Sequence, residues 1–159
     1  MIAAVEGSAA GAGLALVLAC DLVVAARSAR FATAYARVGL SPDGGTSWHL
    51  ARALPRALAA ELLMCGDLVE AERLHALGLV NRLADTGQAL QAALDLADTL
   101  HGRAPNALAS CKELLDEAAH QPLSAQLDLE RAHFLRNLTH ANAGEGIAAF
   151  LDKRTPHWR

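Results

Sequence analysis

A stretch of small residues between two apolar runs near the N-terminus constrains the fold more than any other feature. Residues 1–5 form a short apolar run, and residues 7–13 contain only Gly, Ser and Ala. Residues 14–20 are apolar on nearly all sides of a helix, and residues 21–26 are mostly apolar with two adjacent valines. A strand, a tight turn, a buried helix and a second strand are typical of a βαβ-like unit. We therefore expect an α/β fold at the start of the chain.

The rest of the chain changes from mixed structure to helices. After a short strand over 31–35, a glycine-rich break over 41–46 is expected to contain the start of a helix, and Pro55 interrupts that helix or begins the next. We expect an α/β part over residues 1–87 and a helical region over 88–159. The further elements that we expect are a helix over 70–77, an extended piece over 80–83, and helices over 88–102, 105–120, 123–140 and 144–151.

Composition excludes several classes of partner. The chain has 159 residues, which suits one compact domain, and its net charge of -3 with 4% aromatic residues gives no basic or stacking surface for nucleic acid. Its three cysteines are scattered, which favours a reducing compartment and no disulfide framework. His133 and His140 lie seven apart, and we interpret both as residues of a solvated helix surface. We therefore expect no metal site.

The apolar run over 14–20 has some likeness to the core of a secretory signal. No Lys or Arg precedes Arg27, however, whereas a signal peptide begins with positive charge. Asp21 ends the run well short of the roughly 20 residues that span a bilayer. We expect a cytoplasmic protein with no membrane partner.

The glycines do not form a nucleotide-binding motif. Gly7, Gly11 and Gly13 are spaced G-x-x-x-G-x-G, which differs from the dinucleotide fingerprint, and no Lys-Ser/Thr pair follows as in a phosphate loop. Taken alone, the small residues fit either close packing of a buried helix on the sheet or the approach of a ligand to the backbone.

Six blocks of sequence, in order and spacing, carry a resemblance to a known family. They are Ile2–Gly13, Leu18–Asp21 with Phe31, Gly39–Thr46, Ala59–Gly66, Ala71–Asn81 and Glu145–Pro156. Together they resemble the crotonase superfamily of enoyl-CoA hydratases and isomerases over essentially the whole chain. The resemblance implies the ββα core of the ClpP/crotonase fold followed by a C-terminal helical oligomerisation region. The N-terminal third of the family fold has no counterpart in these residues, so a fragment, a late start and a short paralogue all stay open.

The resemblance implies that the substrate is an acyl-CoA thioester and that no other cofactor takes part. Family members stabilise an enolate with two backbone N–H groups that point at the developing oxyanion. One of these donors corresponds to Ala12, which follows Gly11 and occupies a position where the family usually has glycine. The other donor belongs to the absent N-terminal segment.

The resemblance also predicts which reaction is catalysed. Hydratases of the family carry glutamates at two positions that are Ala15 and Tyr35 in this chain. Asp43 instead stands where family isomerases have a single acid, as in enoyl-CoA isomerases and the ring-epoxide isomerases of phenylacetyl-CoA breakdown. One carboxylate suffices for a 1,3-proton shift, so we expect an isomerase with Asp43 as base. Alternatively, Asp43 caps a helix, or the chain is a catalytically silent CoA-binding protein; a hydratase ranks below these.

The remaining site residues are implied by the same resemblance. The residues expected to bind the substrate in this part of the chain are Gly11, Tyr35, Leu40, Pro42 and Gly44. Leu40 and Trp48 could form a wall of the acyl pocket, but core packing is the safer expectation for both. Phe150 and Lys153 correspond to family positions that meet CoA, although Lys153 also suits the end of a helix. The paired C-terminal helices and the family's usual assembly predict a homotrimer or a dimer of trimers.

Overall fold

Three parallel strands form the first of two small sheets. In the computed structural model, which describes residues 1–159, these strands are β1 (Ile2–Val5), β3 (Leu22–Ala26) and β6 (Arg82–Ala84), in the order β1-β3-β6. Ile2 pairs with Leu22, and β3 is buried from Val23 to Ala26. The apolar runs at the start of the chain therefore form buried parallel strands, as predicted.

The second sheet contains β2 (Ser8–Ala10), β4 (Arg30–Ala32) and β5 (Val69–Glu70), with β2 parallel and β5 antiparallel to β4. The stretch that we expected to be only a turn thus contains a strand, because Ala9 alternates inward between two exposed neighbours and pairs with Phe31. The strand expected over 31–35 ends early, since the chain turns at Ala34, whose φ is +59°.

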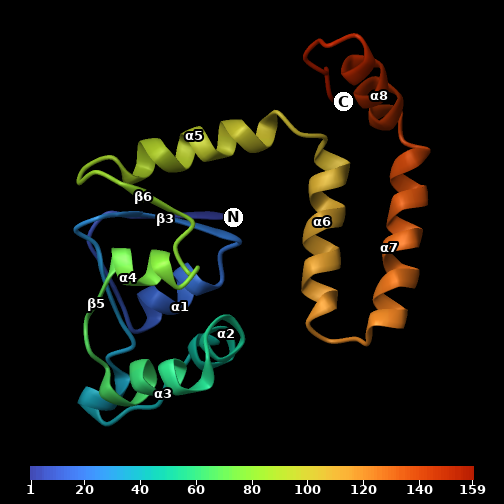
Figure 1. Ribbon diagram of the computed structural model, residues 1–159. Coiled ribbons are helices and arrows are strands. Elements are labelled where there is room, and N and C mark those ends of the chain that lie inside the picture. The colour runs from blue at the N-terminus through green and yellow to red at the C-terminus, as the bar shows by residue number, and fades with distance from the viewer. The chain divides into compact units, whose positions relative to one another are not determined.

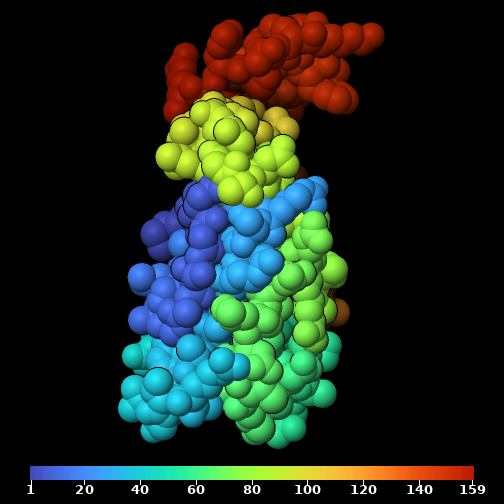
Figure 2. Space-filling view, turned by 90° about the vertical axis from the view of Figure 1, so that its left-hand side faces the viewer, coloured from blue at the N-terminus to red at the C-terminus, as the bar shows by residue number.

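Helices cover these sheets. They are α1 (Ala12–Leu18), the 3-10 helix η1 (Tyr35–Val38), α2 (Thr46–Ala53), α3 (Arg56–Cys65) and α4 (Ala71–Ala76). Leu14 and Ala15 are the buried residues of α1, but Leu16 is 73% exposed, so the helix that we expected to be buried is only partly so. In the space-filling view, segments coloured blue to green pack closely together (Figure 2).

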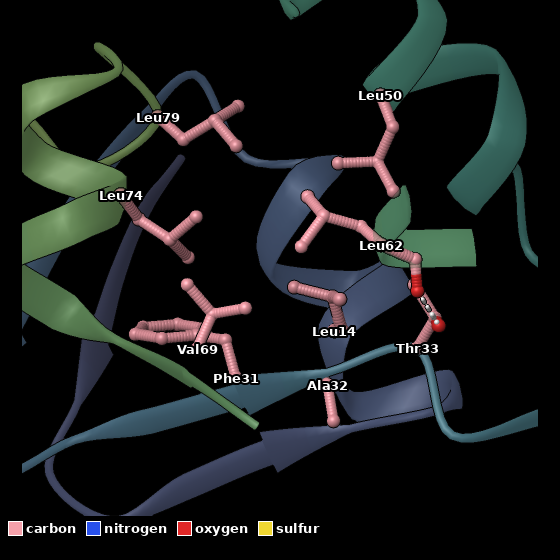
Figure 3. Close-up of a pocket in the computed structure, with 9 residues that line it drawn as sticks. All are labelled: Leu14, Phe31, Ala32, Thr33, Leu50, Leu62, Val69, Leu74 and Leu79. Carbon is pink, nitrogen blue, oxygen red and sulfur yellow. Dashed lines mark hydrogen bonds between the residues drawn. The ribbon is translucent and has the colours of Figure 1, made fainter. Parts of the chain in front are cut away.

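The apolar core between the helices and the second sheet contains one small cavity of about 20 Å³. Figure 3 shows the nine side chains around it, which are Leu14, Phe31, Ala32, Thr33, Leu50, Leu62, Val69, Leu74 and Leu79. Thr33 donates a buried hydrogen bond of 2.7 Å to the carbonyl of Leu62. A cavity of this size holds at most about one water molecule, so it is a packing void and no substrate pocket.

The chain divides into two compact units, Met1–Ala97 and Asp98–Arg159. The division falls within α5 (Ala89–His101), whereas we expected the helical region to begin at residue 88. Ala93 and Leu96 of α5 pack in one buried cluster with Val24 and Ala84, which explains why most of this helix belongs with the sheet.

The second unit is helical, with α6 (Pro105–Ala118), α7 (Leu123–Leu138) and α8 (Ala141–Leu151). Figure 1 shows α6 and α7 side by side as an antiparallel pair. Pro105 begins α6, and the ring of His140 caps α8 by accepting from the N–H of Asn142. His133 is only 8% exposed, so our interpretation of it as a solvated residue was wrong.

Polar side chains hold the second unit together. Asn106 donates to Asn137, Asn137 donates to Ser110, and Asn142 donates to Asn106, at 2.9, 2.8 and 2.7 Å. The C-terminal residues fold back on α8, where Arg159 bonds to Asn142. The large exposed apolar residues of this unit are Leu115, Leu123, Leu127, Phe134, Leu135, Leu138, Ile147, Phe150 and Leu151. None of the chain's helices is both long and apolar enough to cross a bilayer.

Candidate active site

The site begins where β2 passes into α1. The N–H of Gly11 donates to the carbonyl of Ala32 at 3.1 Å, which continues the pairing of β2 with β4 by one residue. Gly11 has φ +55° and ψ -124°, a conformation that glycine alone adopts readily. The chain turns there, and Ala12 becomes the first residue of α1. N–H groups in the first turn of a helix have no acceptor inside it, so the Ala12 N–H is open to a ligand.

Tyr35 lies against this turn. It is the first residue of η1 and is only 8% exposed. A Cβ added to Gly11 would lie 3.8 Å from Cζ of Tyr35 and 4.0 Å from its hydroxyl. The hydroxyl donates to Oδ1 of Asp43 at 2.5 Å. The phenol ring therefore connects the turn before α1 with the loop that carries Asp43.

Asp43 is held at its side chain and at its backbone. Its carboxylate accepts from Tyr35, and its carbonyl accepts from the N–H and the hydroxyl of Thr46, at 3.0 and 2.9 Å. The helix that follows, α2, is capped by Gly45 at φ +82° with no side-chain capping bond. The alternative in which the Asp43 side chain caps a helix is thus contradicted, because Gly45 is the N-cap of α2 and no side chain makes a capping bond there.

Ala15 faces the same loop. A Cβ on Gly44 would lie 2.8 Å from the Cβ of Ala15, which is 4% exposed. Positions 15, 35 and 43, at which the family resemblance places acids, therefore converge. Asp43 carries the one carboxylate among the three residues.

The electrostatics of this group are set by the Tyr35–Asp43 bond. The bond to the Asp43 carboxylate, followed by burial, raises the pKa of Tyr35 above its usual value near 10, and the nearby Thr46 hydroxyl opposes this in part. The phenol consequently stays protonated through neutral pH and acts as a donor. It cannot serve as a base that activates water.

The other expected site residues lie at the margin of this group or in the second unit. The N–H of Leu40 donates to the carbonyl of Tyr35, but its side chain is 65% exposed, while Pro42 is half-buried and Gly44 is exposed. Phe150 is exposed near the end of α8, and Lys153 lies beyond that helix. These two belong to the unit Asp98–Arg159, whereas Asp43 belongs to the unit Met1–Ala97.

Trp48 was expected in the core, yet it is 46% exposed and stacks under the guanidinium of Arg52 at 3.9 Å. Its place on the first turn of α2 next to the Asp43 loop explains the exposure. No group of three or more His, Cys, Asp or Glu side chains is arranged to hold a metal ion.

Two residues that shape the site were missed from the sequence. Thr46 is fully buried and fixes the backbone of Asp43, although it appeared only as part of a Gly-Gly-Thr block. Ala34 takes a left-handed conformation that orients Tyr35. Alanine rarely has a positive φ, so the sequence does not indicate this conformation.

Comparisons with known proteins identify the family. Residues 1–159 match the profile of the family described as enoyl-CoA hydratase/isomerase. The chain is 39% identical to 1,2-epoxyphenylacetyl-CoA isomerase of Escherichia coli K12 over 158 residues, and 36% identical to 2,3-dehydroadipyl-CoA hydratase of the same strain over 159 residues. These alignments cover 99% and 100% of the chain, but 60% and 62% of the relatives.

Solved structures of enoyl-CoA hydratases also resemble the chain. A crystal structure described as an enoyl-CoA hydratase from Polaromonas sp. JS666 superposes with a TM-score of 0.98 at 65% identity, over 99% of this chain and 62% of the other. An enoyl-CoA hydratase from Mycobacterium tuberculosis H37Rv gives 0.96 at 39% identity, over 99% and 63%. The chain thus spans somewhat less than two thirds of the length of these relatives.

Proposed function

Because the chain belongs to the enoyl-CoA hydratase/isomerase family, we propose that it carries the proton-transfer site of an acyl-CoA isomerase that shifts a double bond. The observation that supports this most is the convergence of positions 15, 35 and 43 with a carboxylate at Asp43 alone. A 1,3-proton shift needs one acid that first accepts and then returns a proton, whereas hydration also requires activation of a water molecule.

In the proposed reaction, Asp43 removes a proton from the α-carbon of a β,γ-enoyl thioester. The Ala12 N–H donates to the enolate oxygen that forms, a type of stabilisation typically worth about 3–4 kcal/mol per donor. Asp43 then returns the proton to the γ-carbon, and the double bond ends between the α- and β-carbons. Oδ2 of Asp43 is the oxygen that takes part, since Oδ1 accepts from Tyr35.

A catalytically silent acyl-CoA-binding protein is the second candidate. It is favoured by Ala15 and Tyr35, which stand where hydratases of the family carry glutamates. Hydration ranks third, although a 36% identical relative and the 65% identical crystal structure are both described as hydratases. The Tyr35 phenol, with its raised pKa, supplies no base for water.

Proton exchange at the α-carbon of a β,γ-enoyl-CoA in deuterated buffer tests the proposal. The 159-residue chain is compared with a form whose reading frame is extended upstream of Met1. We expect Asp43→Asn to lower exchange by about 10²–10⁴-fold while acyl-CoA binding persists. Asp85→Asn, a matched change at an exposed aspartate outside the site, should leave exchange unaltered. Binding in either form with neither exchange nor conversion to the α,β-enoyl product would favour the silent protein.

We also propose that the protein is a homotrimer or a dimer of trimers. The large exposed apolar residues of the second unit support this, because apolar surface of this extent usually marks an interface. Light scattering coupled to size exclusion measures the mass directly, and a monomer at micromolar concentration would contradict the proposal.

A further inference from the structure

Tyr35 has a position that a residue lining an acyl pocket does not need. Its side chain is buried, its ring lies against Gly11, and its hydroxyl is committed to Oδ1 of Asp43. A tyrosine that only shaped an apolar wall would not place its one polar atom on the catalytic carboxylate.

The backbone around Tyr35 fixes that hydroxyl. The N–H of Tyr35 donates to the carbonyl of Thr33 at 2.8 Å, and its own carbonyl accepts from Leu40 at 3.0 Å. Ala34 holds a left-handed conformation between them, which is costly for a residue with a Cβ and persists only where its surroundings enforce it. The phenol is thus presented from a rigid turn.

The Asp43 side chain, by contrast, is restrained only by its bond from Tyr35. The residue is exposed in the loop before α2, and Thr46 restrains only its backbone. The bond from Tyr35 is the single hydrogen bond of the carboxylate, so it decides which oxygen faces outward.

We propose that Tyr35 is a positioning residue that orients Asp43 so that one carboxylate oxygen carries the same proton from the α- to the γ-carbon. This inference rests on the proposed isomerase function. In the step, the α C–H bond breaks, the proton moves to Oδ2, the double bond shifts and a γ C–H bond forms. Nothing is oxidised or reduced. A carboxylic acid held against the substrate returns its proton before exchange, whereas a rotating one loses it to water.

The test uses a β,γ-enoyl-CoA with two deuterons on the α-carbon, in ordinary water, with whichever form of the protein turns over. Mass spectrometry of the product gives the fraction of deuterium that has moved to the γ-carbon. We expect measurable transfer in the unsubstituted protein. Tyr35→Phe keeps the ring and removes the hydroxyl, so transfer should fall at least threefold. Loss of a hydrogen bond to a charged group predicts a kcat lower by about 10–100-fold with KM little changed.

Thr86→Val is the matched control, since it removes a hydroxyl of the same unit that bonds Ser28 and does not touch Asp43. Deuterium transfer should be unchanged in this variant. Equal transfer and kcat in Tyr35→Phe and the unsubstituted protein would overturn the role of Tyr35 and leave the isomerase proposal standing. Turnover that survives Asp43→Asn, or no turnover at all, would overturn both. Urea unfolding of each variant verifies that Tyr35→Phe is folded.

Discussion

The two units of this chain bury opposite kinds of side chain. In residues 1–97 the fully buried positions are mainly apolar, with Phe31, Leu50 and Val24 among the largest. In residues 98–159 the buried positions are Ser110, His133, Asn142 and Ala149. The first unit is therefore stabilised by an apolar core, and the second by a network of side-chain amides with apolar residues on its surface.

This difference separates two tasks. The proposed proton-transfer residues lie in the unit with the apolar core, where buried surroundings can hold an exposed carboxylate in place. The second unit instead offers apolar surface outward, as an element that associates does. The comparison would be wrong if truncating an exposed side chain of the second unit destabilised the protein as much as truncating a core side chain of the first.

The largest contrast is expected between Leu50→Ala and Phe150→Ala. Leu50 is 1% exposed in the first unit, and its truncation should lower the free energy of unfolding by about 2–5 kcal/mol. Phe150 is 83% exposed, so its truncation should change the free energy of unfolding of a protomer by less than about 0.5 kcal/mol. Urea unfolding of both variants measures the loss of free energy of unfolding. Equal losses in Leu50→Ala and Phe150→Ala would contradict the comparison, because Phe150 would then contribute as much as a core residue.

A smaller loss is expected when the amide network is cut. Asn142→Ala removes a buried side chain that bonds Asn106 and the backbone of Arg159, and leaves the half-buried amide of Asn106 without this donor. The cost should be about 1–3 kcal/mol, visible as faster amide hydrogen exchange in α8. Glu117→Ala, an exposed change in α6, serves as control. Unchanged protection in Asn142→Ala would show that the network does not stabilise the unit.

Two glycine-to-alanine changes should have opposite signs. Gly11 needs its positive φ, so Gly11→Ala should destabilise the first unit by about 1–3 kcal/mol and lower activity as well. Gly144 lies inside α8 with no atom within 4 Å of an added Cβ, so Gly144→Ala should stabilise by about 0.5–1 kcal/mol. Thermal unfolding checks both, and a stabilising Gly11→Ala would refute the turn geometry.

The acid dependence of stability should come from the second unit. Glu145 binds the guanidinium of Arg154 through both oxygens and also accepts from the N–H of His157, which lowers its pKa from 4.5 to about 2. A lowered pKa adds stability above pH 4.5 that is lost as the pH falls toward 2. In Glu145→Gln, the urea concentration at the midpoint of unfolding should change less with pH between 4.5 and about 2. A midpoint that falls as steeply in the variant would assign the effect to other carboxylates.

The smallest effect concerns Tyr35 alone. It is the chain's single tyrosine, so tyrosinate absorbance reports it without interference from another phenol. Its raised pKa predicts a midpoint above pH 10, and Asp43→Asn should bring the midpoint down by removing the negative acceptor. Because the folded pKa is raised, the stability that this bond contributes is present below pH 10 and disappears above it. An identical midpoint in both proteins would contradict the contact.

Much of the fold follows from local sequence. The apolar residues of β1 and β3 and the helical period of α5 to α8 leave few alternatives, and Pro105 marks the start of α6. The strand β2 escaped prediction because Ser8, Ala9 and Ala10 have little strand preference and pair only through contact with β4.

The positions of the candidate site follow from the sequence, but its geometry does not. The blocks around Gly11 and Asp43 indicate both positions, because a family pattern fixes spacing along the chain. The bond from Tyr35 to Asp43 depends on the backbone at Ala34, whose conformation its own side chain disfavours. Tertiary contacts impose that conformation, and a short stretch of sequence does not predict them.

The pairing of Gly11 with Ala32 has a consequence for how binding would be detected. The N–H of Gly11 is hydrogen-bonded to the sheet, whereas the N–H of the next residue, Ala12, begins α1 and has no acceptor in the helix. Neighbouring amides should thus exchange with solvent at very different rates in the free protein. A bound thioester whose oxygen accepts from Ala12 would lengthen the protected run by one residue, so occupancy of the site would register as the slowing of a single amide.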